Sequence, residues 1–131
     1  MISLMFKKIL SLSAIFILAT STNAATKVEK CEIVLKTGVY NQYLEQMCEF
    51  NGNVSEKFKQ TFNEHSCPTL MTYKEIRKVV GEITEATMNR FTAYGVEKYC
   101  NDNLDSYADL SIALKKGIDM FNQDLFKQKG N

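Results

Sequence analysis

The chain has few of the residues on which enzymes and metal sites depend. Its 131 residues include one histidine, His65, and no cysteine pair at Cys-x-x-Cys spacing. Structural zinc sites take several cysteine or histidine ligands, often at that spacing, so we expect neither a metal site nor a cofactor. A catalytic serine or cysteine would have to use His65 as its base, and this histidine falls on the apolar stripe of a predicted helix, which favours a packing role. The sequence therefore predicts no catalytic residues and a protein that is not an enzyme.

Strand patterns, repeats and an excess of positive charge are also missing. No stretch alternates apolar and polar residues as a half-buried strand does, and no segment recurs or is of low complexity. The basic residues number 16 and the acidic ones 15. Nucleic acids and anionic membranes attract proteins that carry a basic patch, so neither is expected as the main partner. These absences favour an all-α protein with a mixed surface.

The N-terminal residues have the pattern of a secretory signal peptide. A basic start with Lys7 and Lys8 precedes an apolar run over Ile9–Ala19, and small residues follow as far as Ala25. This order is typical of a signal peptide, whereas a transmembrane helix needs about 20 apolar residues. We expect cleavage after Ala24, or else after Ala25.

Removal of the signal peptide, residues 1–24, would leave a single helical domain, residues 25–131, in the periplasm or outside the cell. These 107 residues suit one hydrophobic core, and their 14 basic and 15 acidic residues give a net charge of −1. No membrane contact is expected after cleavage. The domain contains all four cysteines: Cys31, Cys48, Cys67 and Cys100. An even number of cysteines in a small exported chain predicts two disulfides.

The apolar spacing predicts a four-helix bundle with three long helices and one short one. The predicted helices are residues 27–50, a short helix capped by Asn53 and stopped before Pro68, residues 72–94, and residues 104–126. Asn101–Asn103 is expected to be a loop. Gly95 leaves open whether the helix before it continues or a separate turn follows. The stripe of the last helix is narrow, which predicts an outer helix that packs on one side.

The helix over residues 72–94 has the longest clean amphipathic pattern in the chain. Its apolar residues recur at three- and four-residue steps, which is the period of one helix face. Thr72 followed by Glu75 forms a capping box, in which each side chain satisfies the other residue's backbone N–H. We expect this helix to supply the core surface on which the others pack.

The helix over residues 27–50 has no single apolar face. Its apolar residues lie on more than one side when placed at 100° per residue. Two explanations are open: the helix bends at Thr37-Gly38, where glycine weakens it, or it lies between two partners. Both predict a helix that is more buried than average.

An antiparallel hairpin of the first two helices predicts which cysteines pair. If the chain turns at Asn51–Asn53, Cys67 lies one or two helical turns from Cys31. Cys48 then lies about 16 Å from Cys67, which is too far for a disulfide. The next helix runs back toward the turn and brings Cys100 to Cys48. The expected pairs are therefore Cys31–Cys67 and Cys48–Cys100.

Four further residues are candidates for special roles. Arg90 interrupts the apolar stripe of residues 72–94, where it could snorkel to water, form a buried ion pair or contact a partner. Tyr40 and Phe126 lie off the main stripes of their helices and are candidate exposed aromatics. Asn53 begins an Asn-Val-Ser glycosylation sequon, although a helix cap is the favoured use.

The favoured function is an exported, non-enzymatic helical protein that binds a protein partner, of the immunity, inhibitor or chaperone type. The alternative is a carrier for a small apolar ligand, with a cavity between the first helix and the helix over residues 72–94. A large buried pocket would favour the carrier, and an exposed aromatic patch over a solid core would favour partner binding. The sequence identifies neither the partner nor the oligomeric state.

Overall fold

The computed structural model describes residues 26–121, which form a helical bundle stapled by two disulfides. The described residues contain no strand. The helices are α2 (Lys27–Cys48), α3 (Val54–Glu64), α4 (Cys67–Leu70), α5 (Tyr73–Tyr94) and α6 (Val96–Lys115). The predicted fold class is confirmed: α2, α5 and α6 are the three long helices, α3 is the short one, and α4 adds a single turn. The predicted signal peptide lies outside the described residues.

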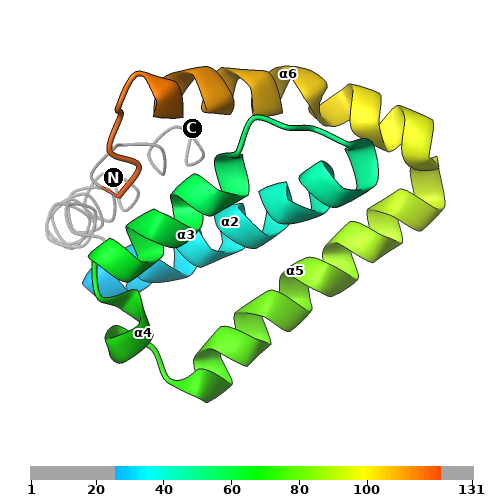
Figure 1. Cartoon of the computed structure of the whole chain (residues 1–131). Helices are drawn as coiled ribbons and strands as arrows, with labels where there is room; N and C mark the ends of the chain where they lie inside the picture. The colour runs from blue at the N-terminus through cyan, green and yellow to red at the C-terminus, as the bar shows by residue number, and fades with distance from the viewer. Residues whose placement is uncertain (1–25, 122–131) are drawn as a thin grey trace, which may run out of the picture.

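Helix α2 lies at the centre of the bundle. It contacts α3, α4, α5 and α6, and Figure 1 shows α3, α5 and α6 arranged around it. Four of its residues are buried: Cys31, Val34, Asn41 and Leu44. A helix between several partners needs apolar residues on more than one side. The interpretation of this segment as a helix packed between partners is therefore confirmed.

Helix α5 is an outer arm rather than the core surface that its sequence pattern suggested. Only Val79 and Thr87 are buried along its 22 residues. Its predicted start is confirmed, because Thr72 Oγ1 accepts the Glu75 N–H at 3.1 Å and the Glu75 carboxylate accepts the Thr72 N–H at 2.9 Å. The expectation that it organises the core is wrong. A clean amphipathic stripe indicates a helix that packs on one side only, and that describes an outer helix.

Helices α2 and α3 form the expected antiparallel hairpin (Figure 1). Cys31 and Cys67 join α2 to α4, and Cys48 and Cys100 join α2 to α6; in each pair the Cα atoms are 5.5 Å apart. Both predicted disulfides are thereby confirmed. They tie the two ends of α2 to elements that follow much later in the chain.

The start of the last helix differs from the prediction. Gly95 has a φ of 82°, which stops α5 and directs the chain into α6 at Val96. This left-handed value favours glycine, which lacks a Cβ. The predicted loop Asn101–Asn103 lies inside α6 and is helical. Asn103 tolerates that position because its side-chain amide donates to the Tyr99 carbonyl at 2.7 Å, one turn earlier.

The end of the last helix also differs, because α6 stops at Lys115 and not at residue 126. Gly117 has a φ of 81°. Its N–H donates to the Leu114 carbonyl at 3.0 Å, and the Ile118 N–H donates to the Ala113 carbonyl at 3.3 Å. These two bonds form a Schellman motif, which ends a helix at glycine. The chain after α6 then folds back onto the bundle, where Met120 and Phe121 are buried.

Candidate binding surfaces

The outer face of α6 carries exposed apolar side chains. Leu104 is 46% exposed and Ile112 is 51% exposed, and Ala108, midway between them, is also exposed. Residues four apart on a helix lie one above the other. The three therefore form one continuous line, which we call the α6 ridge. A different side of α6, with Tyr99, Tyr107 and Ser111, is buried.

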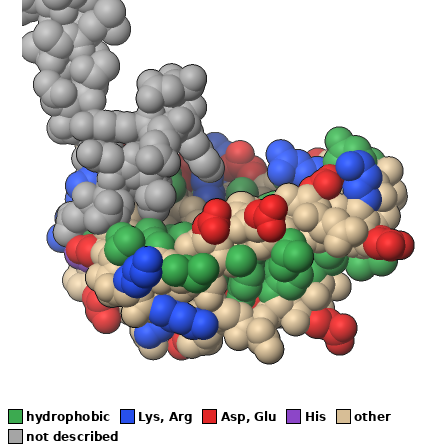
Figure 2. Space-filling model, turned by 90° about the horizontal axis from the view of Figure 1, so that it is seen from above, with side chains coloured by type: hydrophobic (Ala, Val, Ile, Leu, Met, Phe, Trp, Pro, Cys, Tyr) green, Lys and Arg blue, Asp and Glu red, His purple; other side chains and the backbone are tan. Residues whose placement is uncertain are grey.

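Acidic side chains accompany the α6 ridge. Asp102, Asp105 and Asp109 are all exposed, and at 100° per residue Asp105 and Asp109 lie about a quarter-turn from the ridge. Figure 2, which looks down on this side of the bundle, shows hydrophobic side chains gathered next to acidic ones. Asp102 pairs with Lys98 at 3.0 Å. Within residues 26–121 neither Asp105 nor Asp109 forms an ion pair.

A shallow groove lies between α2 and α3. Its volume is about 210 Å³. The apolar part of its lining comes from both helices: Val34, Leu35, Val39, Phe58 and Phe62. The two helices approach closely here because Gly38 has no side chain: a Cβ on it would lie 3.1 Å from the Phe58 Cβ. The cavity of the carrier hypothesis was expected between the first helix and residues 72–94, whereas this groove lies between α2 and α3.

Glu45 of α2 forms a hydrogen-bonded junction with α3 and α6. One carboxylate oxygen accepts the Val54 N–H at 2.8 Å and the Ser55 N–H at 3.2 Å, and it also accepts the Tyr107 hydroxyl at 2.6 Å. The other oxygen accepts the Ser55 hydroxyl. The carboxylate therefore caps the N-terminus of α3, whose first N–H groups have no partner within the helix.

The junction changes the pKa values of both ionisable members. Burial alone would raise the pKa of Glu45, but the hydrogen bonds from Ser55, Tyr107 and the Val54 backbone outweigh it and lower that pKa below its ordinary value. Burial, with the hydrogen bond to Glu45 and its negative charge, raises the pKa of Tyr107 to about 12. Both groups therefore keep their ordinary charge states near neutral pH. With its oxygens occupied by donors, Glu45 acts as a structural cap.

Gly52 brings the turn of the α2–α3 hairpin into the same junction. Its N–H donates to the Tyr107 hydroxyl at 2.8 Å, and its carbonyl accepts the Ser111 hydroxyl at 3.3 Å. A Cβ on Gly52 would lie 2.5 Å from Ser111 Oγ and 3.0 Å from the Tyr107 ring. This residue is therefore glycine because the turn lies directly against α6. Asn53 occupies the N-cap position as predicted, but its side chain makes no cap bond.

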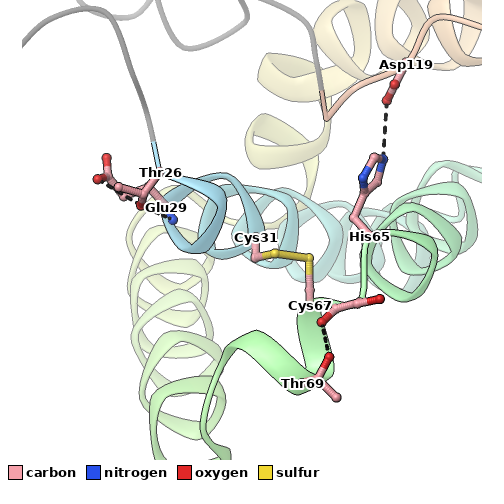
Figure 3. Close-up of a disulfide and its surroundings, with 8 residues drawn as sticks. Thr26, Glu29, Cys31, His65, Cys67, Thr69 and Asp119 are labelled. Atoms are coloured by element: carbon pink, nitrogen blue, oxygen red, sulfur yellow. Dashed lines mark hydrogen bonds and ion pairs between the residues drawn. A yellow bond between two sulfur atoms is a disulfide. The ribbon is translucent and has the colours of Figure 1, made fainter.

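His65 has a packing role in the structure. Its ring stacks on Phe121 with centroids 3.8 Å apart, and its Nε2 lies 3.9 Å from a carboxylate oxygen of Asp119. Figure 3 shows His65 at the end of α3, facing Asp119 from the segment that follows α6. Lys30 lies over the Phe121 ring, 5.5 Å from its centroid. These contacts hold that segment against the N-terminal end of α2 and the C-terminal end of α3.

The other residues selected from the sequence have different positions. Arg90 is exposed on α5, so the buried ion pair considered for it is wrong, while a partner contact stays a prediction. Tyr40 is wrong as an exposed aromatic: it is half-buried against the core, and its hydroxyl donates to the Asn103 side chain. The reason is that α2 has neighbours on several sides. Phe126 lies outside the described residues.

The described residues show no metal-ligand cluster, and all four cysteines are paired. No group of three or more acidic, histidine or cysteine side chains in residues 26–121 could hold a metal ion. The two disulfides use Cys31, Cys48, Cys67 and Cys100. Disulfides of this kind persist in oxidising environments, which is in keeping with a location outside the cytoplasm. None of the described helices is long and apolar enough to cross a membrane.

Comparisons with known proteins assign no family to this chain. No family model matches the sequence, and neither a curated protein nor a solved structure matches it. No residue role can therefore be transferred from a relative. The candidate surfaces rest on the chain's own exposure, charge and contacts.

Proposed function

We propose that this protein is an exported, non-enzymatic helical protein that binds a protein partner in the periplasm or outside the cell. The observation that carries the proposal is the α6 ridge: Leu104 is 46% and Ile112 51% exposed on a helix that buries another of its sides. Scattered apolar residues are normal on protein surfaces, but a continuous apolar line with a polar rim is typical of an interaction site. Such a protein would be of the immunity, inhibitor or chaperone type.

The shape of the α2–α3 groove supports partner binding over a small-ligand carrier. Pockets for small molecules usually enclose about 300–1,000 Å³ and surround most of the ligand. The groove holds about 210 Å³ and is open to solvent along one side. It is therefore small for a carrier. A groove of this shape can instead accept one or two side chains of a bound protein.

The surroundings of the reactive side chains favour a role other than catalysis. His65 is stacked on Phe121, Glu45 is occupied by donors from α3 and α6, and the cysteines are paired. A general base needs a free hydrogen-bonding position near its substrate. His65, Glu45 and the cysteines are thus used in holding the fold together.

Capture of the partner tests this proposal. The protein would be tagged at its C-terminus, expressed with its own N-terminal segment and crosslinked in the exporting cell. The captured protein would then be purified separately and mixed with the purified tagged protein. We expect a saturable complex of fixed stoichiometry. The proposal would be contradicted if repeated experiments captured no protein beyond those captured by an unrelated tagged exported control. It would also be contradicted if the purified components formed no complex.

A further inference from the structure

We infer that the α6 ridge docks an amphipathic helix of the partner, one whose apolar stripe is bordered by lysine or arginine. This inference rests on the proposed function and adds the chemistry of the partner. It combines two observations on one face of α6: the exposed line Leu104–Ala108–Ile112 and the aspartates beside it.

The spacing of the ridge suits a helix. Leu104, Ala108 and Ile112 follow the four-residue rows that form the ridges of a helix surface and pack into the grooves of another helix. The small side chain of Ala108 leaves a dip between two larger ones. A partner side chain can enter this dip, as a knob enters a hole between packed helices. Recognition by a single helix is a common mode that uses anchors at three- and four-residue steps.

The acidic side chains beside the α6 ridge indicate that the partner carries positive charge there. Asp105 and Asp109 are exposed and form no ion pair within residues 26–121, whereas Asp102, on the same edge, already pairs with Lys98. Lysine or arginine beside the apolar stripe of the partner would pair with them. Such complementarity mainly increases the association rate and discriminates between partners. An anionic membrane would be repelled by the same edge.

A second copy of this chain suits the ridge poorly. An antiparallel pairing of two ridges about Ala108 would place Asp109 beside the Asp109 of the second copy, because a two-fold interface presents the same patch from both sides. Like charges that face one another at an interface disfavour it. The acidic edge therefore disfavours antiparallel self-association and favours a basic partner.

Two synthetic helices of opposite charge test this inference. Each is a capped, fluorescently labelled peptide of about 20 residues, which is long enough to form a helix. Both have the same leucine and alanine stripe, and the positions beside it are lysine in one peptide and glutamate in the other. Anisotropy titrations with the processed, disulfide-bonded protein should give a Kd at least about tenfold lower for the lysine peptide. High salt should reduce this difference, since exposed charges are screened.

Matched variants locate the binding site. Leu104→Ser with Ile112→Ser, and Asp105→Asn with Asp109→Asn, should each weaken binding of the lysine peptide by about tenfold. The controls make the same kinds of change on α5: Tyr73→Ser removes a side chain that is 74% exposed, and Glu82→Gln with Glu85→Gln removes two exposed charges. The controls should leave the Kd unchanged. Circular dichroism and thermal unfolding verify that every variant is folded.

Several outcomes would overturn the inference without touching the proposed function. They are equal binding of the two peptides, no binding of either, an equal loss in the α5 controls, and a protein that is dimeric by light scattering with the ridge as its interface. A captured natural partner whose crosslinks fall in the α2–α3 groove and not on α6 would do the same. Failure to find any partner would instead contradict the proposed function.

Discussion

Helices α2 and α5 have the same length, 22 residues, and opposite places in the bundle. Helix α2 has apolar residues on several sides, contacts every other described helix, and contains one cysteine of each disulfide. Helix α5 has the cleaner amphipathic pattern but buries only two residues and contains no cysteine. The comparison shows that a helix with a single, well-defined apolar face lies at the edge of this bundle. A helix at the centre has several faces to cover, and this blurs its pattern.

The two helices also differ in the polar groups that fix their neighbours. From α2, Glu45 reaches across to α3 and α6 and caps a helix other than its own. The acidic cap of α5, Glu75, bonds to Thr72 at the start of the same helix. A long-range cap couples elements to one another, whereas a local cap only defines where a helix begins. Four pairs of substitutions would break or sharpen this contrast, and all compare the free energy of unfolding in urea.

Loss of a disulfide should have the largest effect. Cys31→Ala with Cys67→Ala opens a loop of 36 residues, and Cys48→Ala with Cys100→Ala opens one of 52. The chain-entropy model gives a loss of about 4 kcal/mol for each. The first pair should lose slightly more in practice, because Cys31 and Cys67 are completely buried and their removal also leaves a packing defect. A loss of unfolding free energy below about 1 kcal/mol in both variants would show that the position of α2 does not depend on the disulfides.

A core truncation in α2 should cost more than one in α5. Leu44 is 1% exposed, so Leu44→Ala should destabilise by about 3 kcal/mol through lost burial and a cavity. Ile83 of α5 is half-buried, and Ile83→Ala should cost about half as much, in proportion to the apolar area it covers. Equal losses would mean that α5 contributes to the core as fully as α2 does.

Substitution of each acidic cap by glutamine compares the stability that the Glu45 junction contributes with the stability that the local cap at Glu75 contributes. Glu45→Gln keeps the size of the side chain but removes its charge, and at pH 7 it should cost about 2 kcal/mol. Glu75 also has a lowered pKa, through its backbone and side-chain hydrogen bonds with Thr72, but it is exposed, so Glu75→Gln should cost less.

The Glu45 effect should also depend on pH. Because folding lowers the pKa of this carboxyl, its contribution is complete above its unfolded pKa of about 4.3. The contribution is lost as the pH falls through the lower folded value. Wild type and Glu45→Gln should therefore converge in stability below about pH 4. A difference that stays constant from pH 7 to pH 3 would show that charge at Glu45 does not stabilise the junction.

Substitution of the two mid-helix glycines by alanine should change the free energy of unfolding least, and the two changes should differ in sign or size. A Cβ on Gly81 of α5 meets nothing within 4 Å, so Gly81→Ala should stabilise by about 0.5–1 kcal/mol through better helix propensity. The same gain at Gly38 of α2 is opposed by the Phe58 Cβ at 3.1 Å, so Gly38→Ala should be neutral or destabilising by about 1 kcal/mol. A stabilisation of equal size at both sites would indicate that α3 can move away from α2.

The sequence by itself determined four of the helices, although not the bounds of α6, and the disulfide pairs, because helix periodicity, caps and the hairpin turn are signals within the chain. The capping box at Thr72 and Glu75 lies within one turn, and the hairpin at Asn51–Asn53 makes the pairing of Cys31 with Cys67 a matter of counting residues. The end of α6 also has a short-range sequence signal, because Lys115-Lys116-Gly117 combines basic residues of the last turn with a glycine at C′. That signal was available, and the apolar stripe continuing past it led to the wrong boundary.

Only the tertiary structure decided which helix is central, which side chains form the junction, and which face of α6 is left uncovered. Glu45 and Tyr107 are 62 residues apart in the chain, and nothing near either one marks it as the partner of the other. Gly52 looks like an ordinary turn glycine until α6 lies against it. Leu104 and Ile112 resemble core residues by type, yet they are exposed, because the buried side of α6 is the one with Tyr99, Tyr107 and Ser111. Periodicity reports how apolar residues are distributed around one helix, whereas burial depends on which other helices come to cover them.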